Sequence, residues 1–141
     1  MKAFFDSSVL VPVFYGDHEH HERSIAAFKK YGKAQACCGL HTLAEVYSAL
    51  TRMPGRHRIS AEQAILFIEN VRERLAVVSL DAEEYWHGLK KFADLGIVGS
   101  TIYDAMLGYC ALKAKAQTIY SWNTRHYQQL GPEIVSLLQT P

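Results

Sequence analysis

The stretch that decides the fold of this chain is residues 2–9, Lys2-Ala3-Phe4-Phe5-Asp6-Ser7-Ser8-Val9. It begins with a largely apolar run suited to a buried strand, and the aspartate and two serines that follow favour a helix start. Helical spacing continues to Phe14, although Pro12 is tolerated only in the first turn and keeps this helix short. A strand that leads directly into a helix is the opening unit of an α/β protein.

The same alternation of short apolar runs and helical patterns continues along the chain. Further strands are predicted at residues 35–38, 76–80, 118–120 and 134–137, and helices at residues 16–32, 42–52, 60–75, 81–96, 101–114 and 123–130. This order predicts an α/β fold, a three-layer α/β/α sandwich with a mostly parallel central sheet. At 141 residues the chain is expected to form one domain, residues 1–141.

Apolar spacing within the helices predicts which side chains face the core. In the helix that ends at Gly32, the inner face is expected to be Ile25, Ala26 and Phe28. Ser60 with Gln63 resembles a capping box, and Asp81 is the expected cap of the following helix. In the helix after Ser60, the residues at core spacing are Ile65, Ile68, Val71 and Leu75.

Composition is that of an ordinary soluble globular protein. The chain is 49% hydrophobic, and 15 Lys and Arg against 14 Asp and Glu give a formal charge of +1. Nucleic-acid binding would therefore depend on local patches rather than on a bulk cationic field. No run of about 18 apolar residues predicts a membrane span, and Asp6 interrupts the apolar N-terminal run that resembles a signal peptide. Three cysteines without metal-ligand spacing, of which Cys37 and Cys38 would face opposite sides of a strand, indicate reduced thiols and a cytoplasmic protein.

Four polar residues stand in otherwise apolar stretches near predicted helix starts: Asp6, Glu45, Asp104 and Asn123. In an α/β protein, strand ends and the helix starts that follow them face one crevice, so these side chains are expected to meet there. Carboxylates brought together repel one another unless a cation lies among them, and oxygen ligands suit Mg²⁺ or Mn²⁺. The pattern predicts a divalent-cation site of the kind that hydrolyses phosphodiesters.

Each of these residues also has a purely structural explanation. Asp6 and Asn123 are good N-cap types, and both Thr42 with Glu45 and Thr101 with Asp104 match a capping pattern. One face of the helix around Asp104 carries only small or polar residues, which permits close backbone approach or leaves room for a ligand: Ser100, Thr101, Asp104, Gly108 and Ala111.

Four segments together resemble the PIN-domain fold and, in order and chain length, the VapC-type toxins of bacterial and archaeal toxin–antitoxin pairs: Phe4-Phe5-Asp6-Ser7-Ser8, Leu43-Ala44-Glu45-Val46, Ile102-Tyr103-Asp104-Ala105 and Ser121-Trp122-Asn123-Thr124-Arg125-His126-Tyr127. The resemblance implies a Mg²⁺- or Mn²⁺-dependent endoribonuclease, usually dimeric, that a partner antitoxin holds inactive. By position it implies that Asp6, Glu45 and Asp104 bind the metal, and that Asn123 joins them in the catalytic site. Asn123 stands where many relatives have a fourth acid, and an amide brings an oxygen ligand but no charge.

Residues near these four are candidates for supporting roles, each with a structural alternative. Three hydroxyls are expected to orient the carboxylates or metal waters, unless they only cap helices or face solvent: Ser8, Thr101 and Ser121. Four cations are expected either to contact RNA phosphates or to form a solvated face: Arg52, Arg56, Arg58 and Arg125. Trp122 and Tyr127 either stack bases or, as the more common case, pack in the core.

Two other readings of the sequence are weighed against this one. The run from Asp17 to Glu22 contains His18 and Glu22 four apart, but a polar first helical turn explains it better than a metal site. The competing functions are a DNA or flap-type nuclease of the same fold, and a non-catalytic binding module in which the four residues only cap helices.

Overall fold

The computed structural model describes all residues, 1–141, and its centre is a sheet of five strands that are all parallel to their neighbours. Parallel pairing was expected, and it arises because a helix-containing crossover separates each strand from the next. The strands are β1 (Ala3–Phe5), β2 (Ala36–Gly39), β3 (Ala76–Val78), β4 (Thr118–Tyr120) and β5 (Leu138–Gln139), in the order β3-β2-β1-β4-β5.

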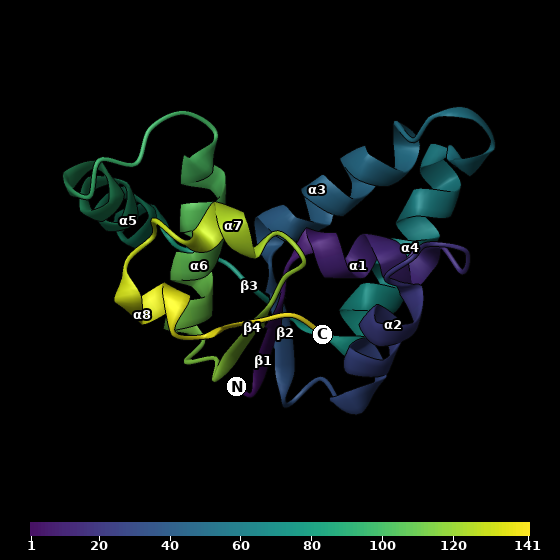
Figure 1. Ribbon diagram of the computed structural model, residues 1–141, viewed down its shortest axis with the longest axis horizontal. Coiled ribbons are helices and arrows are strands. Elements are labelled where there is room, and N and C mark those ends of the chain that lie inside the picture. The colour runs from purple at the N-terminus through teal and green to yellow at the C-terminus, as the bar shows by residue number, and fades with distance from the viewer.

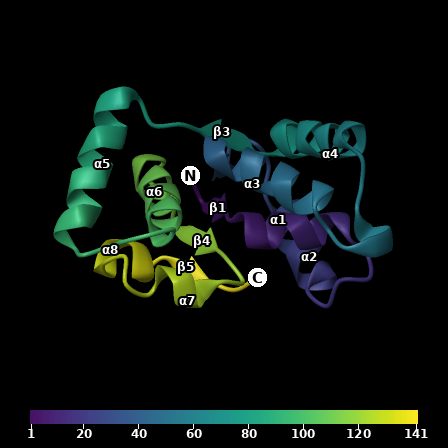
Figure 2. The same ribbon diagram turned by 90° about the horizontal axis from the view of Figure 1, so that it is seen from above.

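Helices cover both faces of the sheet, which confirms the predicted three-layer α/β/α sandwich (Figure 1). One side carries α1 (Ser7–Phe14), α2 (His21–Lys30), α3 (Leu40–Thr51) and α4 (Ala61–Arg74), with a short 3-10 turn at Gly55–His57 between the last two. The other side carries α5 (Ala82–Asp94), α6 (Thr101–Lys113), α7 (Thr124–Tyr127) and α8 (Pro132–Val135). The view from above shows the two helical groups on either side of the strands (Figure 2). No helix has the length and apolar character needed to cross a lipid bilayer.

Alternate side chains of the short strands fill two separate cores. Phe5 and Cys38 belong to the core under α1 to α4, whereas Phe4 and Cys37 belong to the core under α5 to α8. The prediction that the adjacent cysteines face opposite sides of the sheet is therefore confirmed. Burial raises the pKa of both thiols to about 12, so both stay protonated at neutral pH.

Local capping explains where several helices begin. The predicted capping box of Ser60 and Gln63 is formed at α4, and Asp81 forms another with Glu84 at α5. Most of the predicted inner-face residues are buried, among them Phe28, Ile68, Val71 and Leu75, but one position in each helix is wrong. Ile65 is 47% exposed. Ala26 is also exposed, and the buried residues of these two helices are instead Ser24, Ala27 and Phe28 in α2, and Ala64, Phe67, Ile68 and Val71 in α4.

The predicted strand at residues 134–137 is wrong. Gly131 has a φ of +96°, which turns the chain, and Pro132 then occupies the first position of α8. Proline favours that position because its ring fixes φ and its missing N–H is not needed there. The last strand, β5, is present but begins only at Leu138, after α8. It pairs with β4 at the sheet edge.

Two predicted helix starts are also displaced. The segment before α2 forms turns instead of helix, in which His20 donates its backbone N–H to His18 Nδ1, so that α2 begins only at His21. Helix α3 begins at Leu40, directly after Gly39, and therefore two residues earlier than the predicted start at Thr42.

Candidate functional site

The candidate site lies where the strand order reverses. From β1 the chain continues through β2 to β3 on one side, whereas β4 and β5 lie on the other side of β1. Asp6 follows β1 and Ser121 follows β4, so the ends of two adjacent parallel strands place them side by side. The backbone N–H of Asp6 donates to the carbonyl of Tyr120 at 3.0 Å, which continues the pairing past the strands. In open α/β sheets, ligands bind at such a reversal point.

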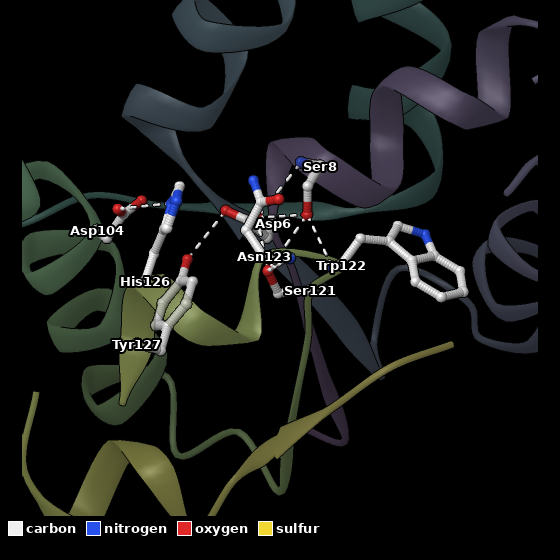
Figure 3. A network of polar contacts seen from close by, with 8 residues as sticks. All are labelled: Asp6, Ser8, Asp104, Ser121, Trp122, Asn123, His126 and Tyr127. Carbon is white, nitrogen blue, oxygen red and sulfur yellow. Dashed lines mark hydrogen bonds and ion pairs between the residues drawn. The ribbon is translucent and has the colours of Figure 1, made fainter. Parts of the chain in front are cut away.

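Asp6 is buried there, with 2% exposure, and four donors hold its carboxylate. Its Oδ2 accepts from the Ser8 backbone N–H at 3.3 Å, from Ser8 Oγ at 2.6 Å and from Ser121 Oγ at 2.9 Å. Its Oδ1 accepts from the hydroxyl of Tyr127 at 2.9 Å. Figure 3 shows these groups converging on Asp6 from three elements of the chain. Asp6 also serves as the N-cap of α1, as predicted, but capping uses only one of its four hydrogen bonds.

The loop after β4 orients the two serine hydroxyls. Ser8 Oγ accepts from the backbone N–H of Trp122 at 2.9 Å, and Ser121 Oγ accepts from the backbone N–H of Asn123 at 3.0 Å. Because each hydroxyl oxygen is engaged by an amide donor, its own proton is free to point at Asp6. Ser8 and Ser121 thus have the contacts expected of residues that orient a carboxylate.

The capping explanation is wrong for Glu45 and Asp104. Gly39 is the N-cap of α3 and Ser100 that of α6, and neither helix start has a side-chain cap hydrogen bond. Thr42 lies within α3, where its hydroxyl and Glu45 Oε1 are both buried without a hydrogen-bond partner. Capping by Thr42 and Glu45 therefore does not explain why Glu45 stands in this position. Its buried carboxylate oxygen has no hydrogen-bond partner, which costs free energy.

The charges of the acidic side chains influence one another. Burial raises the pKa of Glu45 to about 7, and the negative charges of Asp6 and Asp104 contribute in the same direction. Burial also raises the pKa of Asp104, which the charge of Asp6 raises further, whereas His126 acts in the opposite direction. His126 Nδ1 lies 3.6 Å from Asp104 Oδ2, and Figure 3 marks this contact with a dashed line.

These residues fit a divalent cation. The donor set consists of carboxylate oxygens, which hard cations such as Mg²⁺ and Mn²⁺ prefer, and a cation would supply the partner that Glu45 Oε1 lacks. No three acidic, histidine or cysteine side chains already stand in a ligating arrangement. Asp6, Glu45 and Asp104 are the residues that would hold such an ion.

None of the other predicted site residues forms a hydrogen bond or an ion pair with Asp6, Glu45 or Asp104. Thr101 is half-buried and Asn123 is exposed, and neither side chain forms a hydrogen bond; Asn123 contributes its backbone N–H to Ser121. Arg52, Arg56 and Arg58 are exposed at the far end of α3 and in the turn that follows, away from the strand ends (Figure 1). Arg58 donates to the Met53 carbonyl at 3.0 Å, which is a loop contact. Arg125 is exposed on α7 next to the site.

Two residues make contacts with the acidic side chains that were not predicted from the sequence. His126, rather than Arg125, reaches Asp104. Tyr127 is fully buried, so packing and not base stacking is the correct prediction, yet its hydroxyl also holds Asp6. Burial and the charge of Asp6 raise the pKa of Tyr127 well above its usual 10, so it remains a donor. The tyrosine side chain itself could have indicated this contact, because the hydroxyl of a buried tyrosine usually needs a hydrogen-bond partner.

The aromatic and histidine groups nearby are structural. The Trp122 indole N–H donates to Ser24 Oγ at 2.8 Å, and its ring stacks on His20 at 3.8 Å between centroids. His21 Nδ1 lies 2.8 Å from the Pro12 carbonyl oxygen. These contacts bind the segment before α2 to the rest of the domain, and they agree with the preference for a structural role over a metal site in the histidine-rich run.

Comparison with known proteins gives consistent matches. The family model described as "PIN domain" matches residues 3–129. Ribonuclease VapC40 of Mycobacterium tuberculosis is 31% identical over 118 residues, which are 81% of this chain and 81% of that protein. Ribonuclease VapC27 of the same organism is 32% identical over 133 residues, 92% of this chain and 93% of that protein.

Solved structures share the fold. Mycobacterium tuberculosis VapC20, described as a sarcin-ricin loop cleaving toxin, superposes with a TM-score of 0.70 at 13% identity, covering 89% of this chain and 92% of the other. A toxin–antitoxin complex from Klebsiella pneumoniae gives a TM-score of 0.69 at 15% identity, covering 99% of this chain and 98% of the other. VapBC2 from Rickettsia felis, bound to a DNA fragment from the promoter, gives 0.66 at 14% identity, with coverage of 99% and 98%.

Proposed function

The chain belongs to the PIN domain family, and on that premise we propose that it is a metal-dependent endoribonuclease that hydrolyses RNA phosphodiester bonds as the toxin of a toxin–antitoxin pair. The observation that supports it best is the buried, fourfold hydrogen-bonded Asp6 at the strand-order reversal, with Glu45 and Asp104 close enough for its charge to raise their pKa values. The relatives' names favour RNA over the competing DNA or flap-type substrate.

Asp6, Glu45 and Asp104 would hold Mg²⁺ or Mn²⁺. When bound, such a cation polarises the phosphodiester and lowers the pKa of water, which makes hydrolysis possible near neutral pH. The protein fixes Asp6 through Ser8, Ser121 and Tyr127, so one ligand is held before the cation arrives.

Substrate contacts would come from the exposed side of the site. Arg125 and His126 stand on α7 at its rim, where a cation or an imidazole N–H can contact phosphate oxygens. Asn123, which directly precedes α7, is exposed. Its side-chain amide is free to position substrate or metal. The three arginines beyond α3 would contact only RNA that extends well past the site.

The decisive experiment compares RNA cleavage by the wild-type chain, Asp6→Ala and Asp17→Ala in Mn²⁺. Asp17 is an exposed aspartate paired with His57, so its loss controls for the removal of a carboxylate. We expect Asp6→Ala to lose at least about 100-fold in activity, since even partners of metal ligands cost 10- to 100-fold. Equal cleavage by all three proteins would refute the catalytic assignment, and cleavage of DNA in preference to RNA would support the flap-type alternative.

An antitoxin partner and a homodimer are part of the same proposal. Two apolar surfaces support partner binding: Ile65 and Leu66 on α4, 47% and 61% exposed, and a depression of about 510 Å³ between α3, β3, α5 and α6 with Leu40 and Tyr103 at its surface. Co-expression with the adjacent reading frame should relieve growth inhibition and yield a co-purifying complex. Light scattering of the chain alone should give twice the chain mass.

A further inference from the structure

The hydrogen bonds of Asp6 leave little of its carboxylate free. A carboxylate offers about four acceptor positions, two on each oxygen. Oδ2 receives three donors, two from Ser8 and one from Ser121, whereas Oδ1 receives only the hydroxyl of Tyr127. Oδ2 is therefore saturated, and the position that remains for another partner is on Oδ1.

We propose that Tyr127 is a positioning residue for Asp6, whose hydroxyl orients Oδ1 so that Asp6 ligates one cation and does not bridge two. This inference rests on the proposed function, because it takes Asp6 as a metal ligand. It assigns to this chain a site for a single divalent cation.

The surroundings of Tyr127 keep its hydroxyl in place. The residue has 0% exposure and belongs to the same core as Leu130 and Ile134, so its ring cannot turn away without opening a cavity. Asp6 Oδ1 is its hydrogen-bond partner, at 2.9 Å. The phenol oxygen therefore stands at a fixed position relative to Asp6.

The serines keep Oδ2 engaged for a separate reason. Their oxygens accept from the backbone N–H groups of Trp122 and Asn123, and both hydroxyls donate to Asp6 Oδ2. To free Oδ2 for a second cation, both hydroxyl protons would have to turn away from it and the Ser8 backbone N–H would have to give up its contact. A second cation would thus disrupt the contacts that fix the first ligand.

The test is calorimetric titration of Mn²⁺ into the full-length wild-type chain, Tyr127→Phe and the control Tyr120→Phe. Tyr120 is also a buried tyrosine, with 7% exposure, but its hydroxyl pairs with that of Tyr31 at 3.2 Å. We expect one Mn²⁺ per wild-type chain, affinity about tenfold or more weaker in Tyr127→Phe, and wild-type affinity in Tyr120→Phe. Thermal unfolding without metal verifies that both variants are folded.

Two results would overturn the inference: two Mn²⁺ ions bound per wild-type chain, or wild-type affinity in folded Tyr127→Phe, which is what a hydroxyl with a merely structural role would give. The same titration of Asp6→Ala distinguishes a failure of this inference from a failure of the proposed function. If Asp6→Ala binds Mn²⁺ as the wild type does, Asp6 is not a ligand and the metal assignment itself is wrong.

Discussion

Among single residues, Glu45 combines burial, an unpaired oxygen and two acidic neighbours. Its pKa is raised from 4.5 to about 7, so the folded protein binds this proton more tightly than the unfolded chain. The resulting stabilisation is complete below pH 4.5 and is lost as the pH rises through about 7, and it amounts to at most about 3 kcal/mol.

Without divalent cations, the urea midpoint of unfolding should therefore be higher at pH 5 than at pH 8. Glu45→Gln keeps the shape of the side chain but cannot ionise, so the difference between the two pH values should shrink by the contribution of Glu45. Urea titrations of both proteins at the two pH values measure it. Identical pH dependence in the two would show that Glu45 is ionised normally in the folded protein.

Asn123 supports a second prediction at this scale. Its side chain is exposed and has no hydrogen bond, so Asn123→Asp adds a negative charge beside Ser121 without breaking a contact. Cation affinity rises with the charge of the ligands, and we expect Mn²⁺ to bind roughly three- to tenfold more tightly. Gln128→Glu, an exposed position at the end of α7, is the control for charge alone. An equal gain in both variants would place Asn123 outside the site.

Sequence reasoning identified the parts of the site that depend on strand ends. Asp6, Ser8 and Ser121 meet because residues that follow adjacent parallel strands share an edge. The contacts of Tyr127 and His126 with the acidic side chains were not predicted, because the directions of these two side chains depend on the rotation of the four-residue α7, and no periodicity can be read from one turn.

At the scale of elements, α6, which carries Asp104, packs closely on Gly39, the last residue of β2 and the N-cap of α3, which carries Glu45. A Cβ at Gly39 would lie 2.6 Å from Leu107 Cδ2, and Leu107 is only 1% exposed, so it has little room to move. Gly39→Ala should cost about 1–3 kcal/mol by overpacking and should also reduce RNA cleavage.

Gly32→Ala is the matched control, because no atom lies within 4 Å of its added Cβ. Its unfolding midpoint and activity should stay near those of the wild type. If both alanine variants unfold at the wild-type midpoint, Gly39 does not pack tightly against Leu107.

The small face of α6 is explained by packing at Gly108. A Cβ there would lie 2.7 Å from Ile134 Cδ1, so α8 approaches the backbone of α6 directly. Of the two readings of this face, close approach is correct at that position. The segment around Ile134 was predicted as a strand because a single buried isoleucine after a proline is compatible with a one-turn helix as well as with a strand.

For the molecule as a whole, cation binding should appear as added stability. If Mn²⁺ binds only the folded chain, a concentration 100 times the Kd adds about 2.7 kcal/mol and raises the Tm by roughly 10 °C for a domain of this size. Asp6→Ala should show no such increase in differential scanning fluorimetry. An unchanged Tm in the wild type would favour the non-catalytic binding module.

The alternation of strands and helices was enough to predict the layers and the parallel sheet of the whole fold. It did not give the strand order, because a parallel sheet allows each new strand to be added at either edge. The reversal between β1 and β4 depends instead on which faces the later helices bury, and this involves side chains far apart in the chain such as Phe4 and Ile119.

That reversal joins the two ends of the sequence, since Ser121 and Tyr127 lie 115 and 121 positions after the aspartate that they hold. During translation, the first residues leave the ribosome long before these partners are synthesised. A nascent chain thus contains the first acidic ligand but not the groups that fix it, and products that terminate early should be inert. If the chain has the proposed ribonuclease activity, this delay would keep the enzyme inactive while its own messenger is still being translated.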